Sequence, residues 1–225
     1  MAENKKSAEL KKDGEKALKS YQDYLDGLAQ KNPVSSEIFT NKGKAHASIL
    51  MATLLANTEH SLDMYCQGLR PGILCGKQEG DGEGFEGAYW DEFKKFFSKT
   101  IASENFANNS IRILIQCEDW LDYAPFLKVA EALRNRTTKN KITVKVIKPE
   151  DKRQIEESLG KKDSINYNFS IYDNKAFRLE YEPDEYQAIG SFNSPSWCEL
   201  LSNMFQHSYE AATDITDKVR NLGVA

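Results

Sequence analysis

The sequence predicts a single α/β domain in which helices flank a mixed sheet, and three observations support this prediction. Residues 111–117 and 141–147 are short apolar runs rich in β-branched side chains, which is typical of strands covered on both faces. Segments with helical periodicity alternate with these runs, as in parallel sheets with right-handed crossovers. Residues 166–172 and 176–181 flank the turn sequence DNK at 173–175, so we expect a hairpin after the parallel part.

The chain begins with a predicted amphipathic helix over residues 7–28. Apolar positions recur there at helical spacing, charged residues fill the other faces, and an Asn-Pro pair at 32–33 ends the helix. We therefore expect residues 1–33 to form a separate unit whose apolar stripe packs on the domain or on a partner. The stripe consists of Leu18, Tyr21, Leu25 and Leu28.

The α/β domain is expected to span residues 42–216. Residues 45–56 are apolar nearly all round and predict a buried helix. Three parallel strands are expected around Leu62, Ile113 and Val144. The first of these strands covers residues 60–66, and the other predicted elements are a strand at 186–189 and helices at 88–101, 123–135, 150–159 and 196–212. The last helix carries an apolar stripe of Trp197, Leu200, Leu201, Met204, Phe205 and Ala212.

Residues 68–87 contain seven glycines and the acidic stretch 79–86, and they predict a long loop. The glycines lack the GxxxxGK[ST] order of a phosphate-binding loop. Loops of this length in compact domains are usually functional or disordered, so both a mobile surface loop and a ligand lid remain open.

Composition excludes several classes of function. The formal net charge of −4 does not indicate strong nucleic-acid binding, although a local basic patch is compatible with it. The four cysteines form no CxxC pair and the three histidines lie far apart in sequence, so we expect reduced thiols, no metal site and no cofactor. Without a secretory signal or an apolar run long enough to cross a membrane, the chain is expected to be cytoplasmic.

One constellation in the C-terminal third carries chemical information. Asn166-x-Asn168 is followed after four residues by Asp173 and then, after an intervening strand, by Gly190-Ser191 and, one residue later, Asn193. This frame resembles the HxKxxxxD and GSxN motifs of the phospholipase D-like superfamily, and the order of predicted elements around it fits. The resemblance implies a phospholipase D-like fold for the domain.

In that family the histidine attacks phosphorus, and the lysine and GSxN side chains hold the phosphate oxygens. Here Asn166 and Asn168 occupy the histidine and lysine positions. Asparagine is neither a nucleophile nor a cation, so the family's usual chemistry is not expected. The resemblance places Asp173 at the acidic position, and Ser191 and Asn193 at phosphate-contacting positions.

A structural interpretation of GSFN is equally open. Gly190 would supply permissive backbone at a strand-to-helix turn, and Ser191, Ser194 or Ser196 would cap the next helix. Under that interpretation the four residues bind no ligand.

Two functional hypotheses follow. The first is a catalytically degenerate binding or scaffolding subunit, which the resemblance implies could self-associate or join a protein partner in a bacterial nuclease or antiviral-defence complex. The N-terminal helix could serve as its docking element. The second is a nuclease or phosphodiesterase with displaced catalytic residues, for which His60, with Asp63 three positions later, is the alternative catalytic candidate. No membrane association is expected.

Overall fold

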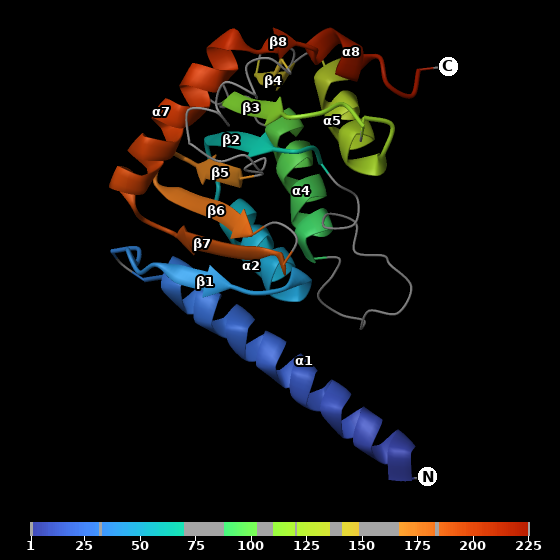
Figure 1. The fold of residues 1–225 in the computed structure, drawn as a ribbon, viewed down its shortest axis with the longest axis vertical. Coiled ribbons are helices and arrows are strands. Elements are labelled where there is room, and N and C mark those ends of the chain that lie inside the picture. The colour runs from blue at the N-terminus through green and yellow to red at the C-terminus, as the bar shows by residue number, and fades with distance from the viewer. Residues whose placement is uncertain are drawn as a thin grey trace, which may run out of the picture.

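The computed structural model describes residues 2–31, 33–69, 88–102, 110–119, 121–135, 141–148, 167–182 and 185–224. Its strands form one eight-stranded mixed sheet in the order β1-β7-β6-β5-β2-β3-β4-β8 (Figure 1). The strands are β1 (Phe39–Asn41), β2 (Ser61–Cys66), β3 (Ser110–Ile115), β4 (Ile142–Val146), β5 (Asn168–Tyr172), β6 (Ala176–Glu182), β7 (Gln187–Ser191) and β8 (Thr213–Asp214). The predicted helix at 150–159, Asn166 and loop residues 70–87 lie outside the described residues.

The parallel part of the sheet is β2, β3 and β4, with Met64 beside Ile113 and Ile113 beside Val144. Helix α4 (Ala88–Ala102) lies between β2 and β3 in the chain, and α5 (Ala124–Arg134) lies between β3 and β4. The prediction of three parallel strands with helical connections is therefore confirmed.

The hairpin joins the sheet beside the first parallel strand. β5 pairs antiparallel with β2, and β6 and β7 continue outward as antiparallel strands. β1 closes this side by pairing with β7, so a strand from the N-terminal part of the chain lies next to one of the last strands. The fold class predicted from the sequence, a mixed sheet flanked by helices, is confirmed.

Helices cover the two faces of the sheet unequally (Figure 1). Helices α2 (Lys44–Ala56), α4 and α5 share one large core with the inward side chains of the parallel strands. Helix α7 (Pro195–Ala211) forms a second core on the other face, where Leu201 and Phe205 pack with Phe169 and Phe177. The apolar stripe predicted for this helix is only partly buried, because Leu200 and Met204 face solvent.

Helix α1 (Ala2–Ala29) runs past the domain, and its N-terminal end projects away from the sheet (Figure 1). Its C-terminal part packs on the domain: Leu25 and Leu28 are buried in the large core, and Leu18 and Tyr21 are partly buried against it. The apolar stripe is thus covered by the chain's own domain. The stripe gives no reason to require a partner.

Candidate functional site

Asn168 opens β5, and both ends of its side chain are hydrogen-bonded. Its Oδ1 accepts the backbone N–H of Gln67 at 2.9 Å, and its Nδ2 donates to Oε2 of Glu180 at 2.7 Å. The second bond follows from the sheet register, which places Asn168 directly opposite Glu180 on β6. Residues directly opposite each other on neighbouring strands have their side chains on the same face of the sheet and within contact distance.

Glu180 belongs to a buried ion pair with Arg178, two positions earlier on the same face of β6. The Arg178 guanidinium donates to Glu180 Oε1 at 2.8 Å, and the two residues are only 4% and 2% exposed. A buried carboxylate of this kind requires a charge partner and hydrogen bonds, and Arg178 and Asn168 supply them. The three residues form one continuous polar row across β5 and β6.

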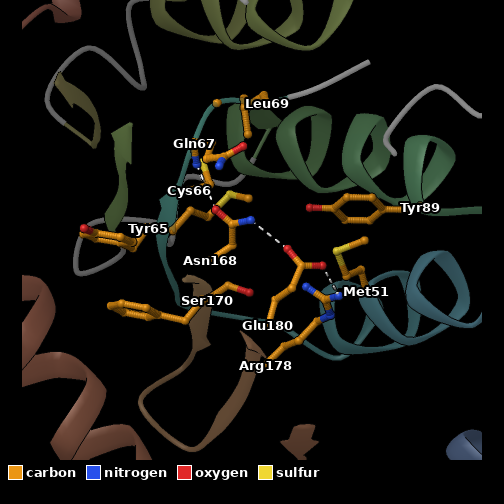
Figure 2. A pocket seen from close by; sticks show the side chains of 13 residues that line it. Met51, Tyr65, Cys66, Gln67, Leu69, Tyr89, Asn168, Ser170, Arg178 and Glu180 are labelled. Carbon is orange, nitrogen blue, oxygen red and sulfur yellow. Dashed lines mark hydrogen bonds and ion pairs between the residues drawn. The ribbon is translucent and has the colours of Figure 1, made fainter. Parts of the chain in front are cut away.

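A cavity of about 70 Å³ lies beside this row, between the sheet and helices α2 and α4 (Figure 2). Its polar wall includes Asn168, Glu180, Arg178, Ser170 and Gln67, and its apolar wall includes Met51, Met64, Cys66 and Leu69. Tyr89, from the first turn of α4, completes the lining.

The Tyr89 hydroxyl points across the cavity toward Asn168 and Glu180 (Figure 2). Burial raises the pKa of this phenol well above its ordinary value, and the nearby acidic groups Tyr172, Cys66 and Glu180 raise it further, while Arg178 opposes them. The hydroxyl therefore keeps its proton and remains both a donor and an acceptor.

The structure places the other motif residues away from Asn168. Ser191 pairs with Phe177 at the far end of β6, whereas Asn168 pairs with Glu180, so β6 separates the two side chains. Ser191 is fully buried, and its Oγ accepts the N–H of Asn193 at 3.3 Å. Asn193 Nδ2 in turn donates to the Val34 carbonyl at 3.2 Å. Ser191 and Asn193 thus do not border the cavity beside Asn168.

The GSFN segment instead joins the strand β7 to helix α7, as the structural interpretation suggested. Ser194 is the residue before α7, but its side chain makes no capping hydrogen bond. Gly190 lies against the ring of Phe39 on β1, where no side chain would fit. The segment therefore binds the start of the chain to the sheet.

Asp173 lies at the hairpin turn, where Asp173 and Asn174 both have φ near +50°. Its carboxylate accepts three backbone N–H groups, from Glu59 at 2.8 Å, His60 at 2.7 Å and Ser61 at 2.8 Å. These bonds tie the turn to the start of β2. Asn168 lies beyond the opposite end of that strand, next to Gln67.

His60 is an exposed residue just before β2, with Nε2 3.7 Å from a Glu59 carboxylate oxygen. Asp63 is buried and binds Arg112 through two hydrogen bonds of 2.7 and 2.6 Å. The Arg112 guanidinium lies over the Phe205 ring of α7. Asp63 therefore anchors α7 rather than pairing with His60.

Sequence reasoning missed Tyr89, Arg178 and Glu180. One signal was present, since β6 has the pattern Arg178-x-Glu180, which places two charged residues on one face of a strand. Tyr89 had no comparable signal, because a tyrosine in an aromatic helix usually belongs to the core.

Within the described residues no cluster of three or more His, Cys, Asp or Glu side chains has a metal-holding arrangement. The described helices include none long and apolar enough to cross a membrane. Among the described residues, Cys66, Cys117 and Cys198 form no disulfide.

No protein-family model matches this chain, and no curated protein matches it. Among solved structures, it is similar to TrmBL2, an archaeal chromatin protein with a novel mode of DNA binding, at 12% identity and a TM-score of 0.49 over 93% of this chain and 67% of that chain. It is also similar to Nuc from Salmonella typhimurium, a phospholipase D family member (15% identity, TM-score 0.44, 79% of this chain and 98% of that chain). NucT from Helicobacter pylori gives 10% identity and a TM-score of 0.46 over 79% of this chain and 99% of that chain. The solved structures similar to this chain thus include a phospholipase D family member, and similarity at this level assigns no activity.

Proposed function

We propose that this chain is a catalytically inactive phospholipase D-like protein that acts by binding, as a scaffolding or regulatory subunit. One observation carries the proposal: both ends of the Asn168 side chain are occupied, by the Gln67 N–H and by Glu180. The position that holds a phosphate-binding lysine in the resembled motif is here a neutral side chain committed to the protein's own groups.

The charge around Asn168 supports the same conclusion. A phosphoryl group needs uncompensated cations or N–H donors around its oxygens. Beside Asn168 stands the carboxylate of Glu180, and the positive charge of Arg178 is paired with it. An incoming phosphate would meet a like charge in a buried setting, which is strongly unfavourable.

The proposed setting is a cytoplasmic complex, and a reducing compartment fits Cys66, Cys117 and Cys198, which form no disulfide among the described residues. The resemblance suggests pairing of two copies or binding to a protein partner, as in bacterial nuclease or antiviral-defence assemblies. No metal or cofactor is part of the proposal.

The first prediction is that the purified protein leaves DNA, RNA and phosphodiester reporters intact. The double variant Asn166→His/Asn168→Lys should also be inactive, because a lysine at position 168 would face Glu180 and be neutralised by it. Product formation is followed by gel and by reporter absorbance.

His60→Ala separates the remaining outcomes. Hydrolysis by the unmodified protein that disappears in His60→Ala would support the displaced-site phosphodiesterase instead. Hydrolysis that survives this substitution would place an active site at other residues, and either result would refute the proposed function.

A further inference from the structure

We propose that the cavity beside Asn168 binds a small neutral group that carries a hydrogen-bond donor and an acceptor side by side, as a carboxamide does. This inference rests on the proposed function, because it names the kind of ligand that a binding protein of this construction would take.

The first step is the inventory of unused hydrogen-bonding groups. Among the described residues the Tyr89 hydroxyl has no hydrogen-bond partner, although the residue is only 4% exposed and its hydroxyl points into the cavity (Figure 2). The Gln67 side-chain oxygen and the Arg178 Nε are buried without a partner among the described residues, and both residues line the same cavity. Buried polar groups of this kind are normally satisfied, so the cavity is built to receive something polar.

The second step is the polarity of those groups. Gln67 offers an acceptor, and each Glu180 oxygen retains a lone pair beyond its bond to Asn168 or Arg178. The Tyr89 hydroxyl, held protonated by burial, offers a donor. A ligand that satisfies all three must donate toward Gln67 and Glu180 and accept from Tyr89. A carboxamide has this combination in one planar group.

The third step is charge and size. Glu180 and Arg178 compensate each other, so a charged ligand would lose its hydration without gaining an unpaired counter-ion. The apolar wall of Met51, Met64 and Leu69 favours a group with a small hydrophobic side. The volume of about 70 Å³ accommodates roughly two water molecules, which suits one small head group.

The test uses three probes of the same shape and different charge: acetamide, acetate and acetamidinium. Each is titrated into the full chain while the side-chain amide signals of Asn168 and Gln67 are followed by NMR. We expect acetamide to shift these signals in a saturable manner and to bind at least about tenfold more tightly than either ion.

Tyr89→Phe removes the donor and keeps the ring, so acetamide affinity should fall by about fivefold to tenfold. Tyr181→Phe is the matched control, because Tyr181 on β6 is more than one-third exposed and lies outside the cavity lining, and its affinity should match the unmodified protein. If Tyr89→Phe is poorly folded, Gln67→Met, which removes the unpaired side-chain oxygen from the cavity wall, should lower acetamide affinity instead.

Two results would overturn the inference. Tighter binding of acetate or inorganic phosphate than of acetamide would show that the site selects anions. Failure of every probe to bind would show that the cavity holds only water. Neither result would bear on whether the protein hydrolyses phosphodiesters. Hydrolysis by the unmodified protein would refute the proposed function, whichever probe binds. The two ideas can therefore fail separately.

Discussion

Within the motif frame, Gly190 is the position where packing leaves room for no residue other than glycine. A Cβ at this position would lie 2.7 Å from Cε2 of Phe39 and 2.8 Å from the Phe177 carbonyl oxygen. The Phe39 ring could shift only at its far end, but the Phe177 carbonyl belongs to the backbone of β6, which pairs with β7 and leaves no room for a methyl group. The side chain of any other residue would therefore separate β1 from the sheet.

We expect Gly190→Ala to lower the free energy of unfolding by about 1–3 kcal/mol, because the added methyl group overpacks a closed space. Urea denaturation provides the measurement. Gly27→Ala in α1 is the matched control, since a Cβ there meets nothing within 4 Å, and it should be neutral or stabilising by up to about 1 kcal/mol. Equal stability of the two variants would show that β1 can move to accommodate the added methyl group without loss of stability.

Asp173 offers a second prediction, because its carboxylate is the common acceptor for the N–H groups of Glu59, His60 and Ser61. Asp173→Asn keeps the size and tolerates φ of 52°, but turns an NH₂ group toward these donors. We expect a loss of about 1–3 kcal/mol in unfolding free energy.

The control for Asp173 is its neighbour. Asn174→Asp makes the reverse exchange at an exposed position with φ of 53°, and its effect should stay within about 0.5 kcal/mol. A similar loss in both variants would show that the turn is sensitive to any exchange at these two positions, and the loss in Asp173→Asn could not then be assigned to the three hydrogen bonds.

Helix α1 is the element for which the structure narrows the sequence-based expectation most. Its stripe was expected to need a domain or a partner, and Leu25 and Leu28 are buried in the domain's own core. Self-association consequently stays a prediction that rests on the family resemblance alone, and light scattering at micromolar concentration tests it.

Truncating Leu25 measures how firmly α1 belongs to the domain. Leu25→Ala empties a site with no solvent exposure and should cost about 2–5 kcal/mol of unfolding free energy in urea. The adjacent Tyr24→Ala removes a larger side chain from a position that is 42% exposed, and should cost much less. If the two costs are equal, α1 is a separable unit after all.

Periodicity explains which elements the sequence could predict. The inner strands and helices α2, α4, α5 and α7 were predicted to within about two residues, because each is long enough to show a burial pattern, whereas α1 begins five residues before its predicted start. β1, β8 and α8 (Thr216–Arg220) have three, two and five residues, so no pattern could identify them. β1 exists because Phe39 finds a place on β7, which is tertiary information.

At the scale of the whole molecule, several thiol and phenol groups have pKa values above their ordinary ones. Burial raises the pKa of the Cys198 thiol to about 11, and the hydrogen bond to Glu37 raises the pKa of Tyr24 to about 12. Burial also raises the pKa of Tyr89, Tyr172 and Tyr209 from the ordinary value of 10.0. The same groups lose their protons at a lower pH in the unfolded chain than in the folded protein.

The sign of the resulting pH dependence is fixed. Their contribution to stability is complete below the unfolded pKa values of 9.0 for the thiol and 10.0 for the phenols, and is lost as pH rises through the folded values. We therefore expect the free energy of unfolding to fall steadily above a pH of about 9, measured by urea denaturation across the alkaline range. A flat profile up to a pH of about 11 would contradict the buried, protonated state of these groups.

The candidate site shows where sequence reasoning reaches its limit. The motif frame singled out Asn168 as a ligand-binding candidate, but its partners Glu180 and Arg178 follow from the register of β5 and β6. Tyr89 reaches the cavity only because α4 packs over the end of β2. The frame also grouped Ser191 and Asn193 with Asn168, because linear spacing does not reveal that β6 lies between them.

Both edges of the sheet end in its shortest strands, and this affects how the protein behaves in a crowded solution. β1 has three residues and β8 has two, and the Tyr21 hydroxyl of α1 donates to the Thr40 carbonyl on β1. Open strand edges recruit further strands and start filaments, so a wide sheet stays dispersed only if its borders are blunt. A chain shortened past Asn41 would lose α1 together with β1 and would expose the five residues of β7 as a new border, so we expect it to aggregate more readily.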